Sequence, residues 1–488
     1  MTSLPAATDF WAHAAVGRWI IEHHQIPHHT LFLWSDNIPW IWHSWLSQVT
    51  FYELLAHVSD NTGSLLAMIL TAFTALFSLL VWWRVWTRRQ VELGAEATPG
   101  FLMALVFLLA IYTAHERFFP RPEIFSAVFL TFVLLLLIQR ITTWKSLVAL
   151  FIIFALWANF HAGLAMGLLL LVISFFCNLA QHRNGKQSGW ELLAILAAVA
   201  GVFVNPYGWH YWAALKPVAS VTFTFIDEWK PFWKYPPLAT PIIISAFACF
   251  IIGVAAWVGS ARRRLEHLCW LLATFVLFIM ARRNIWILAQ VMLAVVACNP
   301  RIFISAKIWN RIQKILRRQK ISERPIKLQS LARWGVCICL FIAVLETLSP
   351  DFFHGYFAAD NVPTKAAKFL QSIPPQDRIF NEYQISSFLE WKLNGKPPLF
   401  IDLLNAYHPQ IMKDYLTIVD GGDAAATQLK KWRIRYIILP QLKSDQNPGR
   451  LMVWLSIQPK WVMVYTSTDA IIWKYEPNAK PKSLFQIQ

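Results

Sequence analysis

Long apolar runs separated by short polar stretches fill the first 350 residues of this 488-residue chain. A helix needs about 17–25 mostly apolar residues to cross a bilayer. We therefore predict an all-α polytopic membrane domain with ten visible spans. They lie near 62–83, 100–114, 123–138, 146–160, 162–180, 190–204, 240–258, 265–280, 285–298 and 331–348.

The pattern changes at about residue 350, where charges of both signs and turn-forming residues separate short apolar runs. This alternation predicts a small α/β domain. Its expected helices are 364–372, 385–393, 409–419 and 424–432, and its expected strands are 378–381, 398–402, 435–439, 461–466 and 470–475. The predicted organisation is an outer segment (1–60), a transmembrane helical domain (61–349) and an accessory α/β domain (350–488).

Composition excludes the ordinary soluble class. Hydrophobic residues make up 57% of the chain and charged residues 15%, whereas soluble proteins have about 45–50% and 25%. The 44 Lys and Arg residues outnumber the 27 Asp and Glu residues, for a formal net charge of +17. Such an excess indicates either a nucleic-acid-binding protein or a membrane protein with basic cytoplasmic loops.

The positions of the basic residues favour the membrane. With the first segment outside, the inner loops hold 19 Lys and Arg residues and the short outer loops hold 7. The positive-inside rule then places the first segment and the α/β domain on the outer face. The basic stretch 301–327 lies between two spans with few aromatic residues, so we interpret it as an anchor near anionic lipid and expect no nucleic-acid partner.

The start of the chain does not fit this topology completely, because no apolar run precedes the outer segment. Either this segment is translocated unaided, or the natural chain has an upstream helix. We favour the second alternative, with eleven spans in all and Asp9 just outside the first. The six cysteines all lie in predicted spans, so no disulfide framework is expected.

The first outer segment is rich in tryptophan and histidine. It contains six of the 26 Trp residues, and seven of the 14 His residues lie before residue 58. Its polar and aromatic groups are Asp9-Phe10-Trp11-Ala12-His13, Gly17-Arg18-Trp19-Ile20, Ile26-Pro27, Trp34-Ser35-Asp36, Pro39-Trp40 and His43-Ser44-Trp45-Leu46. Two interpretations stay open: amphipathic helices on the outer leaflet, or a surface where aromatic rings pack against sugars.

This segment resembles the first outer loop of bacterial GT-C-type polytopic membrane glycosyltransferases. Later pieces fit the same pattern: Arg121-Pro122-Glu123-Ile124-Phe125-Ser126, Asn159-Phe160-His161-Ala162-Gly163, Asn205-Pro206-Tyr207-Gly208 and Glu228-Trp229-Lys230-Pro231. The resemblance implies a GT-C-like fold in the bacterial inner (plasma) membrane. It also implies transfer of a sugar from a polyprenyl-phosphate donor to a lipid or glycan acceptor at the outer face.

The resemblance also implies roles for residues of the first segment. Asp9 would stand at the catalytic centre as general base or metal ligand. Some relatives carry a Glu where Ser44 stands, so Asp36 is the expected substitute for a second carboxylate, and a Mg²⁺ or Mn²⁺ site stays open. The neighbouring polar and aromatic side chains expected to contact substrate are His13, His43 and Trp45.

Polar residues at the outer ends of the spans are further candidates, because such groups are costly unless they are used or paired. We predict Arg121, Arg282 and Arg283 as clamps for the donor phosphate. The alternatives are snorkelling to headgroups or pairing with Glu116, Glu123 or Asp227. The expected substrate contacts at this face also include Glu123, His161, Asp227 and Glu228.

Two other functions stay open. A transporter or flippase of lipid-linked saccharide would favour ionisable residues in mid-span and repeated or broken helices. A non-catalytic subunit of envelope assembly would keep the scaffold without the chemistry. In the α/β domain, Asn381 and Asp402 follow predicted strands, where open sheets bind ligands, although turn residues also occur there.

Overall fold

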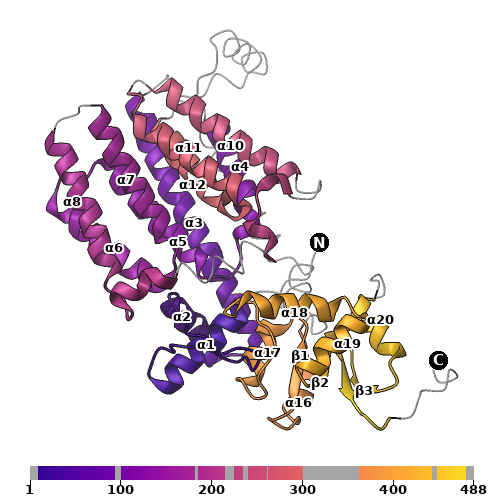
Figure 1. Ribbon diagram of the computed structural model, residues 1–488. Helices are drawn as coiled ribbons and strands as arrows, with labels where there is room; N and C mark the ends of the chain where they lie inside the picture. Colours follow the sequence, from indigo (N-terminus) through magenta and orange to yellow (C-terminus); the bar gives the residue numbers. More distant parts are fainter. Residues whose placement is uncertain are drawn as a thin grey trace. The chain divides into compact units, whose positions relative to one another are not determined.

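The computed structural model describes residues 9–93, 100–181, 185–214, 225–234, 240–260, 262–299, 362–441 and 448–479 (Figure 1). Its contacts divide the chain into two compact units. The first comprises Met1–Ala67, Trp209–Phe225 and Ser349–Gln488, and the second comprises Met68–Gly208 and Ile226–Leu348. The first outer segment and the C-terminal α/β region therefore belong to the same unit.

The second unit is a bundle of apolar helices. It contains α3 (Asp60–Leu93) from Met68 onward, together with α4 (Gly100–Ala114), α5 (Glu123–Gln139), α6 (Trp144–Phe160), α7 (Leu164–Ala180), α8 (Gly185–Val202), α10 (Thr240–Gly259), α11 (Leu265–Met280) and α12 (Ile285–Cys298). These helices coincide with nine of the ten expected spans, while 331–348 lies outside the described residues.

Length and apolar composition alone identify two stretches of this part as able to cross a membrane, Asp60–Glu92 and Pro241–Gly259. Four more helices, α5, α6, α7 and α11, are apolar but shorter. The mostly helical character of the chain is thus confirmed. The number of spans and their orientation stay predictions.

Helix α12 lies at the centre of the bundle. Its side chains from Ile285 to Ala297 are all buried, and α4, α5, α10 and α11 pack around it. A polar contact holds it to α5, where Gln290 Nε2 donates to the carbonyl of Ala127 at 2.8 Å. At another place in the same unit, α6 and α8 run side by side (Figure 1).

The C-terminal region contains a four-stranded sheet of order β1-β2-β4-β3. Strands β1 (Arg378–Asn381) and β2 (Ile434–Pro440) are parallel, whereas β4 (Ala470–Tyr475) runs antiparallel to both β2 and β3 (Trp461–Thr466). The accompanying helices are α16 (Thr364–Leu370), α17 (Ser386–Leu393), α18 (Pro409–Val419), α19 (Gly422–Lys431) and α20 (Arg450–Ile457).

Alternate residues of β2 enter two separate cores, as expected for a strand covered on both faces. Ile437 and Leu439 belong to one cluster of buried residues, and Tyr436 and Ile438 belong to the other. The expected α/β character of this region is confirmed.

One expected strand, 398–402, is wrong. The structure has an isolated bridge there, in which Leu399 pairs with Leu33 of the first segment instead of joining the sheet. Trp34 N donates to the carbonyl of Leu399 at 2.9 Å, and Leu399 N donates to that of Phe32 at 2.8 Å. The apolar run is extended because the N-terminal segment is its partner, which local pattern does not reveal.

The first segment forms helices α1 (Phe10–His23) and α2 (Trp45–Ala56), which pack on each other, and α1 also packs on α17. Gly17 lies where α1 meets α2. A Cβ atom on this residue would stand 2.0 Å from the carbonyl oxygen of Gln48, so only glycine permits this approach.

We predict that Gly17→Ala lowers the thermal unfolding midpoint of the full chain in detergent. Alanine is intrinsically better than glycine in a helix by about 1 kcal/mol, but overpacking costs about 1–3 kcal/mol, so the clash determines the sign. Gly189→Ala in α8 is the matched control, because no atom lies within 4 Å of the added Cβ. Equal midpoints for the two variants would contradict the close approach.

Candidate functional site

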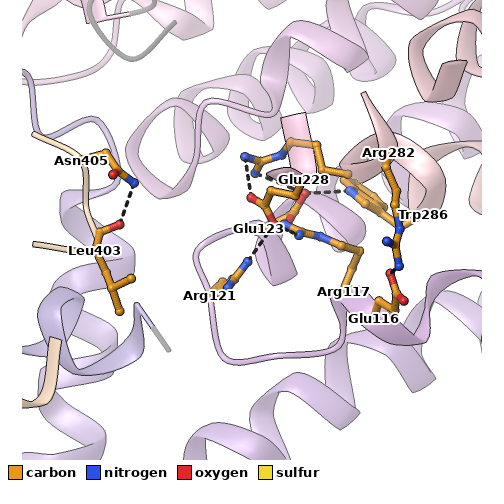
Figure 2. A network of polar contacts seen from close by, with 10 residues as sticks. Glu116, Arg117, Arg121, Glu123, Glu228, Arg282, Trp286, Leu403 and Asn405 are labelled. Atoms are coloured by element: carbon orange, nitrogen blue, oxygen red, sulfur yellow. Dashed lines mark hydrogen bonds and ion pairs between the residues drawn. The ribbon is translucent and has the colours of Figure 1, made fainter. Parts of the chain in front are cut away.

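Seven charged residues gather in the helical unit, where short connecting segments join its helices (Figure 2). We call them the arginine–glutamate cluster: Glu116, Arg117, Arg121, Glu123, Glu228, Arg282 and Arg283. They come from η2 (His115–Arg117) and the loop after it, the first turn of α5, η4 (Asp227–Trp229) and η7 (Arg282–Asn284).

Glu228 is the centre of the cluster. Its Oε2 lies 2.5 Å from Arg117 Nη1 and 3.4 Å from Arg121 Nη1, and its Oε1 lies 3.2 Å from Arg283 Nη1. Glu123 shares two of these partners, since it pairs with Arg117 and lies 3.7 Å from Arg283. One carboxylate therefore contacts three guanidinium groups.

Three further contacts complete the cluster. Arg282 pairs with Glu116. Trp286 Nε1 donates to Glu123 Oε1 at 2.8 Å, and the guanidinium carbon of Arg283 lies 4.2 Å from the centre of the Trp229 ring. These aromatic contacts orient charged groups without neutralising them.

The arginines keep the central carboxylate of the cluster ionised. Burial raises the pKa of Glu228, but the attraction of Arg117, Arg283 and Arg121 outweighs it and leaves the pKa below its usual value. The glutamate therefore stays ionised at neutral pH. Among the described side chains of the cluster, four guanidinium groups pair with three carboxylates.

The expected clamp residues are thus brought together, and the alternative of pairing with glutamates is realised as well. Arg121, Arg282, Arg283, Glu123 and Glu228 all belong to the cluster. The side chain of Asp227 lies outside the described part of the structure. Sequence reasoning did not select Arg117 as a site residue, although its place between two apolar runs was the available signal.

His161 ends helix α6 near this cluster, and its hydrogen bonds determine its tautomer. Gly163 N donates to His161 Nδ1 at 3.1 Å, and Ser126 Oγ lies 2.7 Å from the same nitrogen. Because Trp157 Nε1 donates to Ser126 Oγ, the serine hydroxyl is free to donate to the histidine. Nδ1 is therefore an acceptor, and a neutral His161 carries its proton on Nε2.

A second group of ionisable residues lies in the other unit, around Asp9. This residue directly precedes α1, and its charge acts on the carboxyl group of Asp402. Asp402 is 2% exposed, and its Oδ1 accepts from Asn405 N at 2.8 Å. Burial, reinforced by Asp9 and opposed by backbone hydrogen bonds, raises the pKa of Asp402 to about 7. The structure therefore associates Asp9 with a second carboxyl group other than Asp36.

Asp36 makes different contacts. Its Oδ2 accepts from His408 N at 2.7 Å and lies 2.8 Å from His408 Nδ1, at the start of α18. This contact joins the first segment to the α/β region. Whether Asp36 also acts in catalysis stays a prediction.

The remaining expected contacts of the first segment lie on α1, α2 and the loop between them. His13 Nδ1 is 3.3 Å from Gln48 Nε2. Burial lowers the pKa of His43 to about 4, so this side chain is neutral at pH 7. Trp45 begins α2.

Metal binding stays an expectation. Within the described ranges, no three His, Cys, Asp or Glu side chains are arranged to hold a metal ion. The acidic side chains of the first segment have other partners, as Asp36 has in His408. No step proposed below uses Mg²⁺ or Mn²⁺.

The fold is similar to that of solved structures of ArnT and of the oligosaccharyltransferase AglB. ArnT from Cupriavidus metallidurans, solved with undecaprenyl phosphate, superposes with a TM-score of 0.51 at 15% identity over 98% of this chain and 96% of that one. Its apo structure has a TM-score of 0.50 at 15% identity, over 97% and 94% of the two chains.

A second protein of similar fold is the oligosaccharyltransferase AglB from Archaeoglobus fulgidus, solved with an inhibitory peptide and a dolichol-phosphate. Its TM-score is 0.51 at 12% identity, over 90% of this chain and 66% of that one. No protein-family model matches the chain, and no curated protein matches it by sequence. At these identities the likeness concerns the fold.

We predict that Asp402→Asn reduces the loss of folding stability that the wild-type chain undergoes as pH rises. The folded-state pKa of about 7 exceeds the ordinary 3.8. The free energy of unfolding of the wild type therefore falls as pH rises between these two pKa values, by on the order of 4 kcal/mol in all for a fully buried group. The unfolding midpoint of Asp402→Asn minus that of wild type should therefore be larger at pH 8 than at pH 5.

Asp414→Asn is the control for this measurement. Attraction and hydrogen bonds from Lys431, Gln410 and Trp432 outweigh burial and hold the pKa of Asp414 below its usual value. The ionised carboxylate of Asp414 stabilises the fold equally at pH 5 and pH 8. Asp414→Asn should therefore lower the unfolding midpoint by the same amount at both pH values. A pH-independent difference for Asp402→Asn as well would show that the carboxyl is ionised throughout.

Proposed function

We propose that this chain is a membrane glycosyltransferase. It moves a sugar from a polyprenyl-phosphate donor to a lipid or glycan acceptor at the outer face of a bacterial inner membrane. The observation that carries the proposal is the arginine–glutamate cluster, which gathers four guanidinium groups in a GT-C-like fold. The two proteins of similar fold were solved with undecaprenyl phosphate and dolichol-phosphate, which are ligands of the proposed class.

The exposure of the arginines suggests which of them take the phosphate. Arg121 and Arg283 have side chains 22% and 18% exposed, whereas Arg117 is 8% exposed and contacts two glutamates. Arg117 therefore acts as the fixed support of Glu228. A phosphate can approach the more exposed pair, because a guanidinium fork donates to several oxygens at once.

These roles define a balanced transfer. The acceptor oxygen bonds to the anomeric carbon, the bond between that carbon and the phosphate oxygen breaks, and the acceptor proton passes to Asp9. Arg121 and Arg283 stabilise the charge on the departing polyprenyl phosphate. A general base contributes about 10²–10⁴-fold to such a rate.

The orientation rests on the distribution of basic residues. Nineteen Lys and Arg residues in the predicted inner loops against seven in the outer loops place the first segment and the α/β region outside. Nucleotide sugars are cytoplasmic, so a donor used at this face has to be carried by a lipid phosphate.

We predict that Arg121→Gln and Arg283→Gln weaken binding of labelled polyprenyl phosphate to the purified chain by about tenfold or more, because charge-assisted contacts contribute about 1.5–3 kcal/mol each. Arg89→Gln is the matched control, since Arg89 is an exposed arginine paired with Glu92 on α3. Unfolding midpoints show whether each variant is folded. Equal binding by all three folded variants would refute the clamp.

We predict that Asp9→Asn lowers sugar transfer by about 10²–10⁴-fold and leaves polyprenyl-phosphate binding unchanged. Membranes that contain each variant receive a panel of labelled polyprenyl-phosphate sugars, and transferred label is counted. Unchanged transfer would remove Asp9 from catalysis. Donor binding or lipid movement without transfer by the wild type would favour a flippase or a non-catalytic protein.

A further inference from the structure

Three elements of the helical unit hold the imidazole of His161, to which the function proposed above gives no role. His161 is the first residue after α6, and its backbone N–H donates to the carbonyl of Trp157 at 2.9 Å. Its Nδ1 lies 2.7 Å from Ser126 Oγ on α5 and 3.1 Å from the N atom of Gly163, which directly precedes α7. These contacts fix both the backbone and the ring of the residue.

Gly163 shows how closely this arrangement is packed. A Cβ atom on Gly163 would collide with Ser126 Oγ and would stand 2.8 Å from His161 Nδ1. A larger residue here would push the serine and the histidine apart. The glycine is therefore part of the geometry that keeps the imidazole in place.

The indole of Trp157 sets the direction of the hydrogen bonds. Trp157 and Ser126 are both fully buried, and Trp157 Nε1 donates to Ser126 Oγ at 2.8 Å. An indole N–H can only donate, so the serine oxygen accepts there and its hydroxyl proton is directed at His161 Nδ1. Two donors meet at Nδ1, because Gly163 N donates to it as well. A neutral ring in this tautomer offers a hydrogen-bond donor at Nε2 and no lone pair there, so it cannot act as a general base through that atom.

Ser126 relates this ring to the arginine–glutamate cluster. Ser126 lies one turn after Glu123 on α5, and residues three apart share a helix face. Glu123 Oε2 pairs with Arg117, and Glu123 Oε1 accepts from Trp286 Nε1 at 2.8 Å (Figure 2). Both carboxylate oxygens of Glu123 thus have donors already. A phosphate bound at the cluster would bring further oxygens that can accept a hydrogen bond.

We infer that His161 is a further ligand of the donor phosphate, to which its Nε2–H donates a hydrogen bond. Trp157, Ser126 and Gly163 are positioning residues, because they act on the phosphate only through the histidine. The inference rests on the proposed function, since the phosphate is the one that the arginine–glutamate cluster is proposed to bind. A neutral donor strengthens the hold on an anion without adding a positive charge that would repel the arginines.

The first test is binding of labelled undecaprenyl phosphate to the purified full chain in detergent. His161→Phe should weaken binding by about tenfold or more, because a hydrogen bond to a charged group is lost. His161→Gln, whose side-chain amide carries a donor at a similar distance from the backbone, should recover most of this loss. Unfolding midpoints show whether each variant is folded.

The second test observes the tautomer directly. Solid-state NMR spectra are recorded of the chain with isotope-labelled histidine nitrogens, in vesicles of phosphatidylethanolamine and phosphatidylglycerol. Comparison with His161→Gln assigns the two ring signals of His161. We expect the proton on Nε2, and we expect undecaprenyl phosphate to shift the Nε2 signal much more than the Nδ1 signal.

Trp157→Phe tests the positioning without a change to the histidine. It removes the donor to Ser126, so the hydroxyl is no longer directed at Nδ1, and the spectra should show both tautomers of His161. Binding should weaken less than in His161→Phe. Trp270→Phe is the matched control, since Trp270 Nε1 donates to Ser174 Oγ at 3.1 Å and both residues are buried. This variant should keep the wild-type tautomer and the wild-type binding.

The outcomes separate the possible failures. Wild-type binding that His161→Phe leaves unchanged would overturn the inference and leave the proposed function intact, as would an Nε2 signal that does not respond to bound undecaprenyl phosphate. A proton on Nδ1 in the wild type would overturn the inference whatever the affinity. No binding of undecaprenyl phosphate by the wild-type chain would overturn the proposed donor class and the inference together.

Discussion

Three of the four arginines of the arginine–glutamate cluster meet at one carboxylate, that of Glu228. It contacts Arg117, Arg121 and Arg283, which lie more than 50 residues away on either side in the sequence. Without this carboxylate, guanidinium groups in a partly buried place would repel one another, and loss of one partner of a buried ion pair costs about 3–5 kcal/mol. Glu228 therefore sets the positions from which Arg121 and Arg283 could meet a phosphate.

In the other unit, the first segment is part of the α/β fold and does not merely lie beside it. Leu33 pairs with Leu399, Trp34 Nε1 donates to the carbonyl of Ile379 at 2.9 Å, and Asp36 bonds to the first turn of α18 through His408. The position of Asp9 is consequently determined by residues almost 400 positions later. A change in α17 can alter the environment of Asp9 without touching the first segment.

Local pattern predicted most of the helices and strands. Helix α18 and the hairpin β3–β4 have the bounds expected of them, and α5 ends one residue after its own expected bound. Amphipathic and apolar periodicity are local properties, which is why they were predictable. The strand 398–402 was wrong because its partner, Leu33, lies in another part of the chain. For the same reason the sequence identified the arginines as a set but not their pairing with Glu228. Asp402 was considered mainly as a turn residue, since its burial and the nearness of Asp9 are tertiary properties.

The carboxyl groups of Glu228 and Asp402 have pKa values that are shifted in opposite directions. Glu228 and Asp402 are both buried carboxyl groups, and burial alone raises the pKa of each. Three guanidinium groups reverse this effect at Glu228, which stays ionised and so remains a fixed counter-charge. At Asp402 burial has the largest effect on the pKa, backbone hydrogen bonds oppose it and the charge of Asp9 adds a smaller increase, so that the pKa is about 7. The neighbours of each carboxyl group supply that difference.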